Sequence, residues 1–196
     1  MERCGWATSA PEAYREMYTE YHDQEWGRVL TGDDALFERM SLEAFQSGLS
    51  WITVLRKRPA FRAAFAGFRI DAVAAFTDAD VERLMGDAGI VRNGAKVTAV
   101  LRNARVAQQV EGGLSALLWS FAPTGPRTRP KTLADVPATS PESVAMAKEL
   151  KRRGFGFVGP TTAYALMQAT GMVDDHVATC FRAAGAEPDR VARDRN

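Results

Sequence analysis

The sequence predicts an all-α fold, and three observations favour it. Apolar residues recur at helical spacing in several segments, helix-start signals precede other segments, and no segment alternates apolar and polar residues as a half-buried strand does. A hydrophobic content of 46% and a charged content of 25% are typical of a globular protein. At 196 residues, the chain forms one large domain or two small, interlocked ones.

In the N-terminal half, three segments are predicted helices. Residues 33–47 carry an apolar stripe, and residues 94–110 carry a second one. Between them, Thr77 is followed three residues later by Asp80, the pattern of a capping box. The stripe residues are Leu36, Phe37, Met40 and Ala44 in the first segment, and Val97, Val100, Leu101 and Ala104 in the second.

In the C-terminal half, prolines mark two helix starts. Ser140 and Pro141 provide an N-cap and a first-turn proline for a helix that runs to about Arg153. Pro160 begins another helix. Residues 122–138 are basic and rich in proline, so we expect a long surface loop.

Composition excludes several classes of protein. No run approaches the ~18 consecutive apolar residues of a membrane span, and residues 1–17 lack the apolar core of a signal peptide. Two cysteines do not make a disulfide scaffold, so we expect a cytoplasmic protein with reduced thiols.

The net charge is only +1, but the charges are unevenly distributed. Residues 1–43 hold ten acidic and four basic side chains, whereas residues 92–158 hold eleven basic and four acidic ones. Residues 44–70 hold five basic side chains and no acidic one. The pattern fits either solvated helix faces or one cationic surface for a polyanion.

The two cysteines and two histidines all lie near the ends of the chain. His176 and Cys180 are four residues apart and would share one face of a C-terminal helix. With Cys4 and His22 they would form a closed Cys2His2 site, and four protein ligands with no open position describe a structural zinc. The alternatives are residues with no shared role, or a Cys4–Cys180 disulfide that leaves both histidines unexplained.

Residues 148–171 combine a basic helix, a glycine-rich turn and a second helix. Gly154, Gly156 and Gly159 permit positive φ angles and the close approach of another backbone. The amides at the start of the second helix favour an anion, so the segment fits a hairpin that grips a DNA phosphate. An ordinary connection in a helical bundle is the alternative.

Aromatic residues crowd the first 51 residues, and Glu43 lies among them. Glu43 follows Met40 by three residues and Leu36 by seven, so it shares their apolar stripe and faces the interior. It either forms a salt bridge with an arginine or serves as the counter-charge in a pocket for a flat cationic ligand. The aromatic residues are Trp6, Tyr18, Tyr21, Trp26 and Trp51.

Together these segments resemble the DNA-3-methyladenine glycosylase I family over nearly the whole chain. The matching blocks are MERCGW, YHDQEWG, SLEAFQSGLSWITVLRKR, DAGIVRN, LKRRGFGFVGPTTAYALMQATG and DDHV. The resemblance implies a helix-hairpin-helix fold with one structural zinc. It also implies hydrolysis of the N-glycosidic bond of 3-methyladenine in duplex DNA after the base has been flipped out.

Carried over by motif, the family's site falls on named positions. Glu43 matches the pocket glutamate, the five aromatic residues above match the pocket aromatics, and Gly48 and Leu49 match the segment that wedges into DNA. The zinc ligands would be Cys4, His22, His176 and Cys180, and the DNA contacts of the hairpin would be Lys151, Arg152, Gly154, Gly156 and Gly159. This sequence departs from the family at Phe45, where the family has Gln in LEGQQ.

The resemblance also bears on mechanism. Bifunctional relatives in the wider superfamily use a lysine just after the hairpin, and residues 159–171 contain none, so we expect no lyase activity. Other relatives carry a catalytic aspartate in a VDxHV-like segment, and MVDDHV offers Asp174 at a similar place but with shorter spacing from Gly159. The family does without that aspartate, so helix capping before His176 is the alternative role.

The expected partners are alkylated double-stranded DNA and free 3-methyladenine, for a monomer in the bacterial cytoplasm with no membrane contact. The expected organisation is one glycosylase unit over 1–196, with residues 1–45 and 160–196 stapled by zinc and residues 46–159 forming a second helical part. Two other classes stay open. A non-enzymatic DNA-binding module would release no base, and a zinc-dependent hydrolase would lose activity on chelation.

Overall fold

Helices form almost all of the regular structure in the computed structural model, which describes residues 1–183, and no strand occurs among them. The α-helices are α1 (Gly5–Thr8), α2 (Glu12–Gln24), α3 (Asp33–Gln46), α4 (Trp51–Leu55), α5 (Arg58–Ala64), α6 (Ile70–Ala74), α7 (Asp78–Gly86), α8 (Gly94–Ala107), α9 (Gly113–Trp119), α10 (Pro141–Arg153) and α11 (Pro160–Ala169). Short 3-10 helices span Ala66–Phe68, Leu133–Asp135 and Phe181–Ala183. The all-α prediction is therefore confirmed for the described residues.

The predicted helix starts are correct. The capping box of α7 is present: the Asp80 carboxylate accepts from the Thr77 amide at 2.9 Å. The Ser140 hydroxyl accepts from the Ser143 amide at the start of α10. Two ends differ slightly from the prediction, since α3 stops at Gln46 and α8 stops at Ala107.

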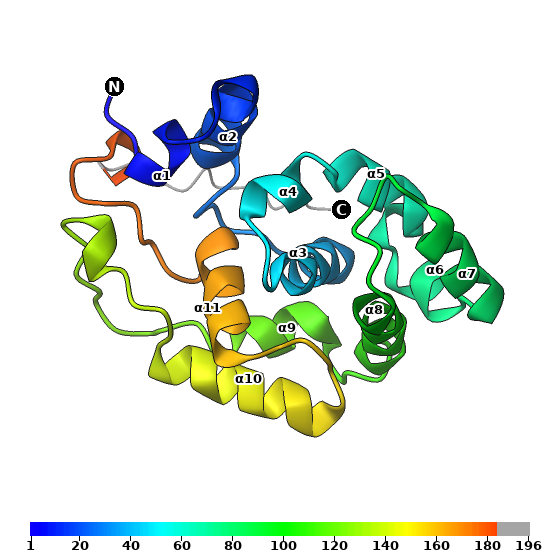
Figure 1. The fold of residues 1–196 in the computed structure, drawn as a ribbon. Coiled ribbons are helices and arrows are strands. Elements are labelled where there is room, and N and C mark those ends of the chain that lie inside the picture. The colour runs from blue at the N-terminus through cyan, green and yellow to red at the C-terminus, as the bar shows by residue number, and fades with distance from the viewer. Residues whose placement is uncertain (184–196) are drawn as a thin grey trace, which may run out of the picture.

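Helix α11 lies at the centre of the molecule, between α3 on one side and α10 on the other (Figure 1). One hydrophobic core extends from α3 to the end of α11 and includes Leu36, Leu101, Met146 and Met167. Because α3 and α11 pack directly on each other, side chains from both can reach one cavity beside them.

The chain after α11 runs back to the N-terminal end of the fold, where it meets α1 (Figure 1). There the amide of Phe181 donates to the carbonyl of Glu2, and Cys4, Val177, Cys180 and Ala183 form a second, smaller core cluster. The C-terminal part of the expected zinc-stapled portion was residues 160–196. Of these, residues 184–196 lie outside the described residues. No helix within residues 1–183 is long and apolar enough to cross a membrane.

Candidate active site and metal-ligand cluster

Glu43 is a buried carboxylate that lines a cavity of about 360 Å³. The residue is 5% exposed, and its side chain has no hydrogen bond or ion pair with any residue in 1–183. Burial raises the pKa of Glu43 to about 7, although the positive charge of Arg39 one helical turn earlier opposes the increase. The salt bridge considered for Glu43 in the sequence is therefore not formed.

Arg39 instead supports an aromatic wall of the cavity. Its guanidinium donates to the Tyr21 hydroxyl at 2.7 Å and lies over the rings of Tyr21 and Trp51. The Glu25 carboxylate accepts from Arg39 at 3.2 Å and also from Arg58. Because Glu25 neutralises these arginines, the cavity carboxylate stays available for a ligand.

The structure brings all five predicted aromatic residues around the same cavity: Trp6, Tyr18, Tyr21, Trp26 and Trp51. Trp6 packs edge-to-face on Tyr18 and Trp26, with ring centroids 5.4 and 5.1 Å apart. The rings of Tyr21 and Trp51 lie 5.4 Å apart. Such packing fixes the rings, so the cavity offers flat faces with negative potential beside a carboxylate.

A second wall of the cavity comes from α11 and the segments around it. Gln168 and Asp175 contribute polar groups there. Asp175 is 3% exposed, and its carboxylate accepts from the Tyr164 hydroxyl at 2.6 Å and the Gln168 amide at 2.9 Å. Arg127 lies 3.5 Å from the same carboxylate, and Leu133, Val136 and Ala165 complete the wall.

Asp174, the aspartate considered for catalysis, does not line the cavity. Its carboxylate is paired with Arg129 at the surface and accepts from the backbone amide of His176 at 3.2 Å. No α-helix begins at this point, so the expected helix-capping role is wrong, and Asp174 stabilises a turn.

Cys4, His22, His176 and Cys180 form one buried cluster, with their four candidate ligand atoms within 4.8 Å of one another. The Sγ atoms of Cys4 and Cys180 each lie 3.6 Å from Nδ1 of His176, and Cys180 Sγ lies 3.5 Å from Nε2 of His22. A tetrahedral zinc with usual bond lengths separates sulfur and nitrogen ligands by about 3.5 Å. The four side chains therefore fit a metal ion of that geometry.

The remaining ring nitrogens of the two histidines are held by acceptors. Nδ1 of His22 lies 2.8 Å from the Asp23 carboxylate, which also binds Arg3, and Nε2 of His176 lies 3.2 Å from the carbonyl of Trp26. These acceptors orient both rings so that the unprotonated nitrogen points toward the cluster. Metal-ligating histidines usually donate their other ring N–H to a carboxylate or a carbonyl in the same way. Burial lowers the pKa of His176 to about 4 and raises that of Cys4 to about 12, so a nearby cation would be needed to hold a thiolate.

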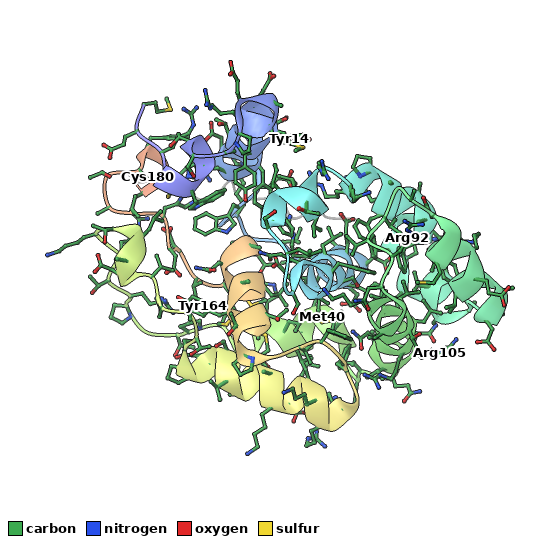
Figure 2. All side chains as sticks on the ribbon, in the orientation of Figure 1. Tyr14, Met40, Arg92, Arg105, Tyr164 and Cys180 are labelled. Atoms are coloured by element: carbon green, nitrogen blue, oxygen red, sulfur yellow. The ribbon has the colours of Figure 1, made fainter. Side chains whose placement is uncertain are left out.

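The route by which His176 and Cys180 meet differs from the prediction. Residues 174–180 form turns and irregular chain rather than a helix. The two side chains nevertheless converge, because the segment turns back against α1, where Cys180 lies (Figure 2). Both cysteines are free thiols, so the alternative disulfide is not formed.

The glycine-rich turn between α10 and α11 is fixed to α8. Gly154 ends α10 with a φ of 101°, as expected for a left-handed cap. Asn103 of α8 both donates to the Gly156 carbonyl and accepts from the Gly156 amide. Gly159 stands before α11 with open space around its α-carbon, whereas a side chain at Gly156 would collide with Arg102.

The side chains expected to contact DNA differ in exposure and in whether another residue binds them. Lys151 is exposed, whereas the equally exposed Arg152 is bound to Glu149 at 2.6–2.7 Å. In the segment after α3, Gly48 has a φ of 80° and Leu49 is 42% exposed. The Lys96 ammonium holds this segment by donating to the carbonyls of Phe45 and Ser47.

Comparison with known proteins identifies the family. The methyladenine glycosylase family model matches residues 6–183. The chain belongs to the methyladenine glycosylase family. It is 45% identical to DNA-3-methyladenine glycosylase 1 of Escherichia coli, over 96% of this chain and 100% of that one, and 40% identical to DNA-3-methyladenine glycosylase of Haemophilus influenzae, over 91% and 96%.

A solved member of the methyladenine glycosylase family has the same fold. The 3-methyladenine DNA glycosylase I of Staphylococcus aureus, solved to explain 3-methyladenine recognition, superimposes with a TM-score of 0.85 at 32% identity. The match covers 95% of this chain and 99% of that one.

Phe45, where the chain departs from the family pattern, faces away from the cavity. It is fully buried against Phe61 and Phe65, with ring centroids 4.6 and 5.8 Å away. The neighbouring Gln46 lines the cavity instead. The departure therefore changes the core behind α3 rather than the polar groups presented to a ligand.

Several cavity residues of this methyladenine glycosylase were missed in the sequence: Gln46, Leu133, Val136, Ala165, Gln168 and Asp175. Leu133 and Val136 lie in the segment expected to be a surface loop, which in fact covers one side of the cavity. The one available signal is the pair of adjacent aspartates in MVDDHV, of which Asp175 and not Asp174 lines the cavity.

Proposed function

We propose that this protein is a monofunctional DNA glycosylase that removes 3-methyladenine from alkylated DNA during base excision repair. The observation that supports this most directly is the cavity in which Glu43, a buried carboxylate without a donor, faces aromatic rings. Membership of the methyladenine glycosylase family, at up to 45% identity to named glycosylases, supports the same conclusion.

The cavity suits a cationic purine. Alkylation at N3 gives the base in DNA a positive charge, which stacking on Trp51 and attraction to Glu43 would favour over a neutral base. The raised pKa of Glu43 also suits a group that can accept a hydrogen bond when ionised and donate one when protonated. We therefore assign base recognition to Glu43, with Trp6, Tyr18, Tyr21, Trp26 and Trp51 as the surrounding rings.

Duplex DNA would bind across the hairpin and the segment after α3. Pro160 has no amide hydrogen, so the amides of Thr161 and Thr162 are the first in α11 that can meet a phosphate. Open space at Gly159 allows that approach, and we assign nearby backbone contacts to Gly154, Gly156, Lys151 and Arg152. This is the arrangement of a helix-hairpin-helix, and it contacts the backbone without reading sequence.

Opening of the duplex is assigned to Gly48 and Leu49. Gly48 has a positive φ, and the exposed Leu49 that follows it is an apolar side chain of the kind that inserts between base steps. Flipping places the damaged base in the cavity, where water can reach the sugar. Because the charged base leaves readily, the protein's main tasks are to select the base and to stabilise positive charge on the sugar.

The metal that we propose for Cys4, His22, His176 and Cys180 is one structural zinc ion. Four protein ligands leave no open position, so the ion would join the two ends of the described chain rather than take part in hydrolysis. No lysine occurs in residues 159–171, which supports hydrolysis without lyase activity. We also propose a monomer in the bacterial cytoplasm, the location that the bacterial relatives support.

The test is incubation with methylated duplex DNA, followed by chromatographic identification of the released bases. We expect free 3-methyladenine and an intact, uncleaved strand with an abasic site. Release of no base would support the DNA-binding module considered from the sequence. Loss of release on removal of the metal from a protein that stays folded would support a metal-dependent hydrolase.

A further inference from the structure

Gly156 in the hairpin turn is a glycine for a steric reason rather than a conformational one. Its φ angle lies outside the left-handed region, unlike that of Gly154, so its backbone would accept another residue. A Cβ atom at Gly156 would, however, collide with the guanidinium of Arg102 and lie 3.3 Å from the Cβ atom of Ala99. Both of these residues belong to α8, so the glycine leaves room for an arginine of another helix to lie against the hairpin.

The guanidinium of Arg102 has no acceptor in the part of the protein that the structure describes. Arg102 is exposed, and its side chain forms no hydrogen bond or ion pair with any residue in 1–183. Arg105, almost one turn later on α8, differs because its guanidinium donates to the carbonyls of Ala74 and Phe76 at 3.0 and 2.7 Å. All five N–H donors of Arg102 can therefore turn to an external anion.

The arginines of the hairpin itself are bound within the protein. Arg152 and Arg153, at the end of α10, both donate to the carboxylate of Glu149 at 2.6 Å. That carboxylate offsets part of their charge and holds their donors. Arg102 is therefore the arginine that contacts the turn and keeps its charge unpaired among the described residues.

Arg102 lines a groove of about 370 Å³ between α8 and the hairpin. Asn103 holds the two elements together through hydrogen bonds with Gly156 at 2.8 and 3.1 Å, where the α10–α11 connection meets α8 (Figure 1). On the hairpin side, Phe157 is 39% exposed and has a φ of 56°, which is uncommon for a bulky residue and marks a turn that its surroundings enforce. Arg102 supplies the only charge among the described residues that line the groove, which are Gly94, Ala95, Thr98, Ala99, Arg102 and Phe157.

We propose that Arg102 binds a phosphate of the DNA, so that α8 supplies the hairpin turn with an unpaired cation. The choice of DNA as the ligand rests on the proposed glycosylase function. A groove with an unpaired guanidinium and no carboxylate attracts a polyanion, and the planar fork of arginine matches two phosphate oxygens. The DNA backbone is then held from two elements, α11 and α8, and Asn103 keeps the hairpin fixed to the second of them.

The test compares Arg102→Gln with Arg105→Gln, a control that removes the same charge from the same helix. Arg105 lies on the side of α8 that faces α6 (Figure 2). Affinity for a duplex with an abasic site is measured by fluorescence anisotropy at salt concentrations from about 0.05 to 0.3 M. We expect Arg102→Gln to lower the slope of log affinity against log salt by ~0.9 and to bind roughly three- to tenfold more weakly at about 0.1 M salt. Arg105→Gln should keep the slope of the wild type.

Gly156→Ala tests the same contact from the side of the hairpin. The new Cβ atom would push the Arg102 guanidinium away, so the slope should fall as it does in Arg102→Gln. Combining Arg102→Ala with Gly156→Lys empties the space against the turn and returns a cation to it. We expect this double variant to recover the slope of the wild type to within about 0.3.

Melting temperatures separate phosphate binding from a structural role, because a mere support of the turn would lower stability and weaken binding equally at every salt concentration. An unchanged slope in folded Arg102→Gln would overturn the proposal. So would a double variant that keeps the reduced slope, because Arg102 would then act by shaping the turn. If the wild type binds the abasic duplex but releases no 3-methyladenine from methylated DNA, the proposed function fails while the Arg102 contact stands. Normal release with an unchanged slope would remove the Arg102 contact alone.

Discussion

Glu43→Gln should stabilise the free protein at high pH. Burial raises the pKa of Glu43 from its ordinary value of 4.5 to about 7, so the folded state holds a proton that the unfolded chain has lost in this range. The free energy of unfolding of the wild type therefore falls as pH rises from about 4.5 to about 7. Above pH 7 both states are ionised, and the full cost of the buried charge is present.

The size of the effect follows from this difference in pKa. At about 1.4 kcal/mol per pKa unit, the buried charge costs about 3 kcal/mol at pH 8 and about 1 kcal/mol at pH 5. Glutamine keeps the shape without the charge, so Glu43→Gln should be more stable than the wild type by about these amounts. For a protein of this size, 3 kcal/mol corresponds to an increase in melting temperature of roughly 6–12 °C.

The assay is thermal and urea unfolding of both proteins at pH 5 and pH 8. Glu38→Gln is a matched control on the same helix, because Glu38 is paired with Arg62 rather than buried without a donor. Breaking that pair should cost no more than about 1 kcal/mol and should not stabilise the protein at either pH. A stability difference for Glu43→Gln that is the same at both pH values would refute the reasoning.

Three further predictions concern ligand, metal and DNA. In calorimetric titrations, Glu43→Gln should bind free 3-methyladenine roughly ten- to a hundred-fold more weakly, since hydrogen bonds to charged groups contribute about 1.5–3 kcal/mol. Trp51→Ala should also weaken binding, with less effect on the preference for 3-methyladenine over adenine. An unchanged affinity in Glu43→Gln would mean that 3-methyladenine binds elsewhere. Metal analysis should find one zinc ion per chain. Cys180→Ala should lose the zinc and melt at a lower temperature but still fold, because the main hydrophobic core does not include the metal-ligand cluster. A freshly purified wild-type protein without zinc would show that the cluster is not a zinc site. Gly159→Val should fold normally, since the position has open space and a φ of −69°. It should bind abasic duplex DNA more weakly, with the slope of log affinity against log salt reduced by ~0.9 for each lost phosphate contact. Binding equal to that of the wild type would mean that the hairpin does not hold the DNA backbone.

Most of the long helices were predicted because local signals specify them, but α2 (Glu12–Gln24), which is as long as α10, was not. Capping residues and apolar stripes mark α3, α7, α8, α10 and α11, and these signals act over a few residues. Short helices such as α4 and α6 were not predicted, because five residues carry too little periodicity and tertiary packing stabilises them. The same limit explains why residues 174–180 were assigned to a helix: a spacing of four is also compatible with a turn that folds back.

In the candidate site, residues with unusual chemistry were predictable and ordinary ones were not. A carboxylate in an apolar stripe and the small set of cysteines and histidines stand out in one sequence. Gln168 and Asp175 do not, because polar residues near a helix end are common at the surface. Only the fold shows that the chain after α11 returns past the cavity and turns Asp175 inward.

Helix α11 explains why these separate features belong to one site. Its first turn follows the hairpin that we assign to DNA, its middle carries Tyr164, and Gln168 near its end lines the cavity. The segment that leaves it places Asp175 at the cavity and His176 in the metal-ligand cluster. His176 in turn contacts the carbonyl of Trp26, a residue of the aromatic wall. Helix α11 therefore holds one wall of the cavity, and the metal-ligand cluster holds the aromatic wall. A metal ion in that cluster would affect base recognition by positioning Trp26 and Trp6 rather than by taking part in the reaction.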